Sequence, residues 1–217
     1  MSFRLLPYIV GYDNILDINC NTGIFMLAHK GKLYARVSDI LKPFVNFDGI
    51  SQEVLQAKAL VGTMVHDCIE KIVKGEPYPT IGVRKCDGYI ESFKCWMRAL
   101  NPTFLKSEER YYCDEMLITG QVDSIVKLEG EEKCLLVDFK TSVQESPTWI
   151  MQAHLYYYLI SKNSSNLDLS KRFLFLKLDR YGQLPIVFEY HFDDRMNQRC
   201  MQAVKDYWNR VNVDVIS

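Results

Sequence analysis

The sequence predicts an α/β fold in which a central mixed β-sheet is flanked by helices on both faces. Two observations lead to this prediction. The chain has 217 residues, 48% of them hydrophobic, which is enough to bury one sizeable core in a single domain. The spacing of the apolar residues changes along the chain from helical to alternating, in the order helices, three strands, helix, two strands, helix.

The first fifty residues are expected to form an N-terminal extension with a small β-hairpin, and residues 51–217 are expected to form the core. Two short apolar runs within residues 23–38 surround a His-Lys-Gly-Lys sequence, which is typical of a hairpin. Apolar residues then recur at helical spacing from Ser51 to Lys74, and Gly75 is placed to end that helix.

A second helix is predicted over residues 87–100, because Asn101 and Pro102 stop it. Its apolar face is expected to consist of Ile90, Phe93, Trp96, Met97 and Leu100.

The rest of the chain is expected to alternate between strands and helices. The predicted order is strands over 105–115, 116–128 and 133–142, a helix over 146–163, strands over 172–178 and 184–192, and a helix that begins near Asp193. Ser146 is the expected N-cap of the helix over 146–163, with Pro147 in the first turn, where its missing N–H does no harm.

Charge and cysteine content narrow the functional classes. The formal net charge is -1, so a nucleic-acid partner would have to be bound by a local basic patch or through cations. Seven scattered cysteines without a C-x-x-C pair favour reduced thiols in a cytoplasmic compartment over a disulfide framework or a cysteine zinc site. The apolar run at the N-terminus is too short for a signal peptide or membrane span, so no membrane partner is expected.

The strand predicted over 133–142 carries an unexpected pair of charges. Side chains alternate along a strand, so Asp138 and Lys140 share one face while Phe139 points to the other. A carboxylate in an apolar strand needs a partner, which here is the lysine or a metal ion. A similar acid-x-Lys triplet at residues 131–133 lies in a polar turn and is expected to be solvated.

Asp123 lies on the strand that should neighbour this one, after Gly120. Neighbouring strands are about 5 Å apart, so Asp123 and Asp138 can converge, and two carboxylates that close repel unless one is protonated or a divalent cation lies between them. Magnesium suits this ligand set better than zinc. The alternative is a buried Asp–Lys ion pair with no catalytic role.

Three other polar residues are candidates for the same site. His66 lies at the edge of the apolar stripe of its helix, one turn after Gly62, and is either a metal ligand or a hydrogen-bonded surface histidine. Gln152 and Tyr156 are at i and i+4 in the helix after the Asp-x-Lys strand, where they could contact phosphate oxygens or simply anchor the helix.

These residues resemble the motifs of the PD-(D/E)xK nucleases, in particular the branch with RecB-type, lambda-exonuclease-like and CRISPR-associated exonucleases. The matching segments, in chain order, are "GTMVHDCIEK" with His66, "GQVD" with Asp123, "VDFK" with Asp138 and Lys140, and "QAHLY" with Gln152 and Tyr156. The resemblance covers roughly residues 36–190, and four weak motifs in the correct order make a strong signal. It implies a restriction-endonuclease-like core.

The resemblance also implies a role for each residue. One or two Mg²⁺ or Mn²⁺ ions would be held by His66, Asp123, Asp138 and the backbone carbonyl of Phe139. Lys140 would orient the attacking water and offset negative charge. Gln152 and Tyr156 would bind the substrate strand, and either Glu108 or Glu109 would be an accessory acid.

The function implied is that of a metal-dependent exonuclease that hydrolyses phosphodiester bonds at the ends of single-stranded or duplex DNA, in replication, recombination or repair, including phage and mobile-element types. Only Cys200 lies where related proteins carry an iron–sulfur cysteine group, so no cluster is expected. A homo-oligomer or a recombination or replication partner is compatible with the sequence. The alternatives are a structure-specific endonuclease on the same fold and a DNA-binding or partner-binding module without turnover.

Overall fold

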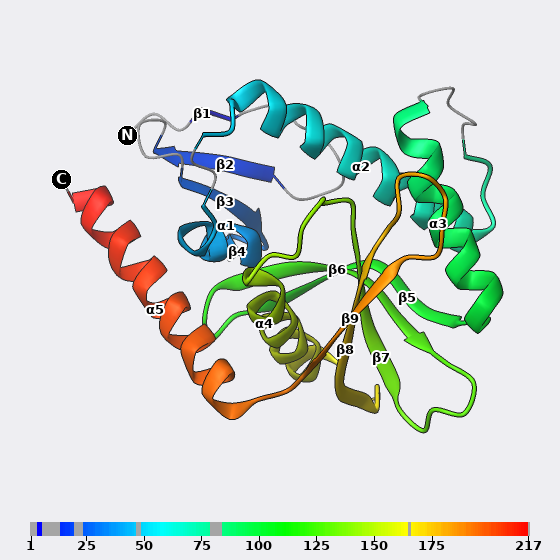
Figure 1. Ribbon diagram of the computed structural model, residues 1–217. Helices are drawn as coiled ribbons and strands as arrows, with labels where there is room; N and C mark the ends of the chain where they lie inside the picture. The colour runs from blue at the N-terminus through cyan, green and yellow to red at the C-terminus, as the bar shows by residue number, and fades with distance from the viewer. Residues whose placement is uncertain are drawn as a thin grey trace.

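The computed structural model describes residues 4–5, 14–19, 24–46, 49–78, 84–164 and 166–216 (Figure 1). The strands are β1 (Arg4–Leu5), β2 (Asn14–Asn19), β3 (Ile24–His29), β4 (Lys32–Arg36), β5 (Thr103–Cys113), β6 (Ile118–Lys127), β7 (Cys134–Lys140), β8 (Leu169–Lys177) and β9 (Ile186–His191). The helices are α1 (Val37–Leu41), the short 3-10 helix η1 (Lys42–Phe44), α2 (Gln52–Lys74), α3 (Arg84–Leu100), α4 (Thr148–Asn163) and α5 (Asp194–Ile216). The predicted mixed α/β fold, with a central sheet flanked by helices, is confirmed.

All described strands belong to one mixed sheet. The strand order is β1-β2-β3-β4-β6-β7-β8-β9, and β5 pairs with β6 beside this path. β4 is parallel to β6 and β7 is parallel to β8, whereas the other pairs are antiparallel. α4 connects β7 to β8, which is the helical crossover that parallel neighbours need.

The N-terminal hairpin is part of this sheet. β3 and β4 are joined at Lys30 and Gly31, which have φ values of 46° and 75°, as the two-residue turns that match strand twist require. β4 continues the sheet by pairing with β6 at Ile118 and Thr119. The predicted hairpin is confirmed, and the sheet runs without interruption from it into the core.

Local signals fix the ends of α2. The Ser51 hydroxyl accepts a hydrogen bond from the Val54 backbone N–H, 3.4 Å away, and Gly75 ends the helix with a left-handed φ of 69°.

α3 buries Ile90, Phe93 and Trp96 as predicted. The prediction for Leu100 was wrong, because it is the last helical residue and is 43% exposed.

The start of α4 differs from the prediction. The helix begins at Thr148 with Pro147 as its N-cap residue, so Ser146 lies one residue before the cap. Ser146 nevertheless stabilises the helix start, since its hydroxyl accepts a hydrogen bond from the Thr148 N–H at 3.3 Å. α5 begins as expected, with a carboxylate oxygen of Asp193 accepting from the Met196 N–H at 2.7 Å.

The two faces of the sheet bury separate cores. α1, α4 and α5 pack on one face, and α2 and α3 pack on the other (Figure 1). Phe139 of β7 lies in the second core, where its ring makes an edge contact with Phe93 of α3 at a centroid distance of 5.1 Å. β6 and β7 are therefore covered on both sides, and polar groups on them are shielded from water except at the strand ends. No helix in the described ranges is long and apolar enough to span a membrane.

Candidate active site

β6 and β7 separate where both strands carry an aspartate. Their backbones pair only from Ser124 to Val126 on β6 and from Leu135 to Val137 on β7. Asp123 and Asp138 are the next residues on the open side of these pairs. β6 with its partner β5 and β7 with its partner β8 thus diverge and form a fork in the sheet. The carboxylates of Asp123 and Asp138 are both buried in this fork.

One hydrogen bond joins the two sides of the fork. Oδ2 of Asp123 accepts from the backbone N–H of Phe139 at 2.7 Å. The next carbonyl, that of Lys140, accepts from the backbone N–H of Leu178, the residue after β8, at 2.8 Å. Because the N–H and C=O of one strand residue point to the same neighbour, the Phe139 carbonyl faces the fork, as a metal-ligating carbonyl would have to.

A histidine and two carboxylates lie together beside the fork. His66 Nδ1 of α2 lies 3.3 Å from Glu108 Oε1 of β5 and 3.5 Å from Asp123 Oδ1 of β6. One ligand atom from each of the three residues lies within 4.8 Å of the others. α2 and the hairpin formed by β5 and β6 therefore bring a nitrogen and two carboxylate oxygens to one point.

Glu108 reaches this point through an unusual backbone conformation. Its φ is 51°, which is uncommon for a residue other than glycine. The register places it opposite Asp123, between the pairs Ser107–Ser124 and Glu109–Val122.

The structure separates the two glutamates that the sequence left as alternatives. Glu109 lies outside the cluster, where its carboxylate accepts hydrogen bonds from Lys106 at 3.0 Å and from the Tyr111 hydroxyl at 3.2 Å. Glu108 is therefore the acid that the fold brings to the site.

Sequence reasoning missed Gln121, which positions Glu108. Its side-chain amide donates to Glu108 Oε2 at 2.8 Å, and its carbonyl oxygen accepts from Arg110. The sequence signal was slight: Gln121 shares a strand face with Asp123, two residues away.

A second group of side chains lies on the α4 side of the fork. Lys140 Nζ is 2.5 Å from Asp138 Oδ1 and donates a hydrogen bond to Gln152 Oε1 at 2.9 Å. The Gln152 amide in turn donates to Asp138 Oδ2 at 3.3 Å and to the Tyr156 hydroxyl at 2.9 Å. All four residues predicted for this part of the site thus form one network.

Gly120 makes the network possible. A Cβ at this position would lie 2.6 Å from a ring carbon of Tyr156, closer than real Cβ atoms approach other atoms. Any larger residue would push Tyr156 away from Gln152. The glycine of the "GQVD" segment therefore has a steric role that depends on the helix packed against it.

Burial and neighbouring charges shift the pKa values of these groups. Burial and the nearby Asp123 carboxylate raise the pKa of Asp138 to about 7, although Lys140 opposes them. Burial would lower the pKa of His66, but the carboxylates of Asp123 and Glu108 outweigh it and hold that pKa well above its usual value. Burial would raise the pKa of Asp123, but His66 and Lys140 hold it below its usual value.

The donor set fits a hard divalent cation. It combines carboxylate oxygens, one imidazole nitrogen and one backbone carbonyl, which suits Mg²⁺ or Mn²⁺. Asp138 Oδ1 is buried, and the Lys140 ammonium contacts it at 2.5 Å. In the absence of a cation, the protonated imidazole of His66 and the ammonium of Lys140 supply the positive charge that the carboxylates need.

Comparisons with known proteins give structural matches alone. No protein-family model and no curated protein matches the chain. A provisionally named exonuclease of Eubacterium rectale matches with 14% identity and a TM-score of 0.49, over 82% of this chain and 79% of its own. An alkaline exonuclease of Laribacter hongkongensis matches with 8% identity and a TM-score of 0.39, over 84% of this chain and 89% of its own.

The four motifs read from the sequence meet around a single fork. The histidine segment supplies His66, the "GQVD" strand supplies Asp123, the "VDFK" strand supplies Asp138 and Lys140, and the "QAHLY" helix supplies Gln152 and Tyr156. This arrangement is the one that the resemblance to the PD-(D/E)xK nucleases implies. In the motif of those nucleases, Asp138 and Lys140 would be the (D/E)xK part and Asp123 the preceding acid.

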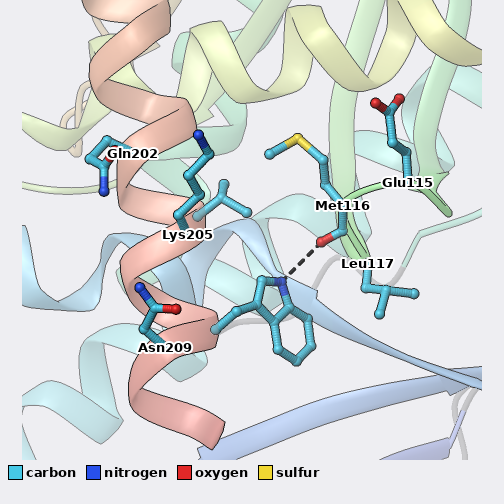
Figure 2. Close-up of a pocket in the computed structure, with 8 residues that line it drawn as sticks. Glu115, Met116, Leu117, Gln202, Lys205 and Asn209 are labelled. Atoms are coloured by element: carbon cyan, nitrogen blue, oxygen red, sulfur yellow. Dashed lines mark hydrogen bonds between the residues drawn. The ribbon is translucent and has the colours of Figure 1, made fainter.

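A pocket of about 680 Å³ lies elsewhere, between α5 and the turn that joins β5 to β6 (Figure 2). Its wall includes Glu115, Met116 and Lys205, and the Trp208 indole donates a hydrogen bond to the Met116 carbonyl at 2.9 Å. None of the fork residues lines it, so this pocket is not part of the candidate active site.

Two basic residues of the β8–β9 hairpin, Arg172 and Lys177, have partners within the protein. Arg172 makes ion pairs with Glu131 and Glu189, and Lys177 donates a hydrogen bond to the Val143 carbonyl at 3.1 Å. The charge of Arg172 is therefore paired within the protein rather than free to bind phosphates.

Proposed function

We propose that this protein is a divalent-metal-dependent deoxyribonuclease that hydrolyses phosphodiester bonds at DNA ends. The observation that carries the proposal is the meeting of His66, Glu108, Asp123, Asp138 and Lys140 at one fork, with the Asp138 oxygen buried beside Lys140. Burying this many charges is costly, so a fold that only needed stability would gain from replacing them. The assignment as an exonuclease rests on the resemblance of the four sequence motifs to the branch of PD-(D/E)xK nucleases that contains RecB-type, lambda-exonuclease-like and CRISPR-associated exonucleases.

Mg²⁺ or Mn²⁺ would be held by His66, Glu108, Asp123, Asp138 and the carbonyl of Phe139. When bound, such a cation neutralises a phosphate oxygen and lowers the pKa of water. The formal net charge of -1 supports this reading, because a chain without a basic field needs another source of positive charge to bind phosphates.

Lys140 has the position that a water-orienting group requires. Its side chain is 19% exposed. Its ammonium contacts the Asp138 carboxylate and donates a hydrogen bond to Gln152, and these contacts hold it in place. An ammonium has three donors, so one remains for a water or a phosphate oxygen. Its fixed charge would stabilise the negative charge that develops on the phosphate during hydrolysis.

Gln152 and Tyr156 act on the other side of Asp138. The amide of Gln152 holds both Asp138 and the Tyr156 hydroxyl, so the carboxylate cannot rotate freely. We propose that this pair also contacts the substrate strand, with the Tyr156 hydroxyl as the group that can donate to a phosphate oxygen.

The test is hydrolysis of linear single-stranded, linear duplex and covalently closed DNA, each with Mg²⁺, Mn²⁺ or EDTA. The proposal predicts loss of linear DNA only, abolished by EDTA and reduced at least about 100-fold by Asp138→Asn or Lys140→Met. Cutting of closed circles would show an endonuclease instead. Binding of DNA without hydrolysis under all metal conditions would show a binding module and refute the enzyme.

A further inference from the structure

Tyr181 is the most exposed large apolar side chain in the described part of the chain. Its exposed fraction is 71%, and no other Phe, Tyr or Trp of known exposure in these ranges is comparably uncovered. An aromatic ring that is exposed to water gains none of the free energy that burial would provide. The position of Tyr181 at the tip of the β8–β9 hairpin therefore suggests a role in binding.

Arg180 pairs with this ring. Its guanidinium carbon lies 4.7 Å from the ring centroid, and the guanidinium donates a hydrogen bond to the Tyr181 hydroxyl. Within the described ranges no carboxylate forms an ion pair with Arg180. The tip therefore presents a planar aromatic group and an uncompensated positive charge side by side, unlike Arg172 in the same hairpin, which is paired with two glutamates.

The backbone under this pair is held firmly by α3. The Asp179 N–H donates to the Ser92 hydroxyl at 2.9 Å, and the thiol of Cys95 contacts the Gly182 carbonyl at 3.6 Å. Within the turn, Asp179 Oδ1 accepts from the Tyr181 N–H at 2.8 Å.

Gly88 lets the turn approach the helix, because a Cβ at that position would lie 1.8 Å from the Arg180 carbonyl oxygen. The exposed pair is thus presented on a fixed turn rather than on a loose loop, which lowers the entropy cost of binding a partner.

This turn lies at the same edge of the sheet as the candidate active site. β7 and β8 are parallel, Lys140 is opposite Lys177, and the Leu178 N–H donates to the Lys140 carbonyl at 2.8 Å. Tyr181 is three residues further on, so its Cα lies within roughly 15 Å of the Lys140 backbone. In Figure 1 the orange β8–β9 loop and the segment after β7 rise on the same side of the sheet, towards α2 and α3.

We infer that Arg180 and Tyr181 stack an unpaired nucleobase of the substrate strand a few nucleotides from the scissile phosphate. The inference rests on the proposed nuclease function and specifies its substrate as a single-stranded or frayed end. Every base has an aromatic face, so a tyrosine can stack on it without sequence preference, and the adjacent guanidinium adds attraction for the strand. A base inside a blunt duplex does not offer that face.

The experiment measures binding of the full chain to a fluorescent oligothymidine and to a blunt duplex, in EDTA so that hydrolysis does not interfere. Tyr181→Ala is expected to weaken binding of the single strand by about 5- to 150-fold and to leave duplex binding unchanged. Tyr181→Phe keeps the ring and should stay within about 2-fold of the parent. Arg180→Gln should make the affinity for the single strand less dependent on salt concentration, by the amount expected for the loss of about one phosphate contact.

Leu184→Ala is the matched control. Leu184 is 60% exposed on the same hairpin but has no aromatic face, so its loss should leave single-strand binding unchanged. An equal loss with Leu184→Ala would overturn the stacking inference in favour of a general apolar contact. An equal loss of duplex binding with Tyr181→Ala would overturn the requirement for an unpaired base.

Hydrolysis distinguishes this inference from the proposed function. With Mg²⁺, Tyr181→Ala should raise KM for single-stranded ends and leave kcat unchanged. Normal KM in that variant, with hydrolysis intact, overturns the stacking inference alone. Absence of hydrolysis in the parent protein overturns the nuclease, whereas Tyr181-dependent binding of the single strand would still support the stacking site.

Discussion

The carboxylate of Asp123 accepts the backbone N–H of Phe139 across the gap between β6 and β7, at 2.7 Å. Phe139 is a core residue between Asp138 and Lys140, so this single bond fixes the (D/E)xK segment relative to the other acid. It also occupies one oxygen of Asp123 and leaves the second beside His66. Asp123 thus has a structural role and, in the proposed function, a ligating role, and substitutions can separate the two.

Asp123→Asn and Asp123→Ala should differ in stability but not in activity. Both remove the charge, so both are expected to lower DNA hydrolysis by at least about 100-fold. The asparagine carbonyl can still accept the Phe139 N–H, whereas alanine leaves that buried donor unsatisfied at a cost of about 1–3 kcal/mol. Urea unfolding should therefore show a smaller loss of unfolding free energy for Asp123→Asn. Equal losses would mean that the hydrogen bond contributes nothing.

Glu108 and Glu109 provide a matched pair of substitutions in adjacent positions. Glu108→Gln removes one carboxylate from the cluster with His66 and should weaken Mg²⁺ binding or hydrolysis by about 10- to 100-fold. Glu109→Gln removes a half-exposed ion pair with Lys106 and keeps an oxygen that can accept from the Tyr111 hydroxyl, so it should leave both within about 2-fold of the parent. Isothermal titration with Mg²⁺ and hydrolysis rates test both. A larger effect at Glu109 would place the accessory acid there.

The sequence predicted the residues that lie on regular strands and helices better than those that depend on tertiary contacts. Asp138 and Lys140 share a face because strand side chains alternate, and Gln152 and Tyr156 share a face because they are four residues apart in a helix. Those relationships hold before any packing is known, and the structure joins all four residues in one network.

The choice between Glu108 and Glu109 could not be made from the pattern. Alternation places adjacent residues on opposite faces, but the left-handed φ of Glu108 changes the direction of its side chain. Likewise, the role of Gly120 depends on the position of the Tyr156 ring in α4, a contact between segments 36 residues apart in the numbering. Register and helix packing decide such features, and neither is encoded in a short segment.

Gly120→Ala is expected to damage the site, whereas Gly62→Ala is expected to be harmless. At Gly120 the added methyl group would meet Tyr156 at 2.6 Å, so overpacking should cost about 1–3 kcal/mol and displace the ring from Gln152. At Gly62 the nearest atom is the Thr141 hydroxyl at 3.5 Å, and alanine inside a helix is favoured over glycine by about 0.5–1 kcal/mol. Thermal unfolding and hydrolysis rates should fall for the first variant alone. Parent-like rates in Gly120→Ala would show that the Tyr156 position does not matter.

The metal-free protein is expected to lose stability as the pH rises through neutrality, and Mg²⁺ is expected to restore it. Burial and Asp123 raise the pKa of Asp138 from 3.8 to about 7, so the stability associated with its proton is fully present below about pH 4 and is lost as the pH rises to about 7. His66 contributes in the same direction. Its pKa in the folded protein is raised above the unfolded value of 6.5, so the stability from its proton is also lost as the pH rises past 6.5 and through the raised pKa. A bound cation replaces these protons, and its binding must release them.

Thermal unfolding from about pH 5 to about pH 8 measures this linkage. With EDTA the Tm should fall across the range, and the increase in Tm caused by Mg²⁺ should grow with pH. Asp138→Asn has no titrating carboxyl at that position, so its Tm in EDTA should depend less on pH and Mg²⁺ should raise it less. An increase in Tm with Mg²⁺ that is the same at both ends of the range would show that the cation does not bind at the fork.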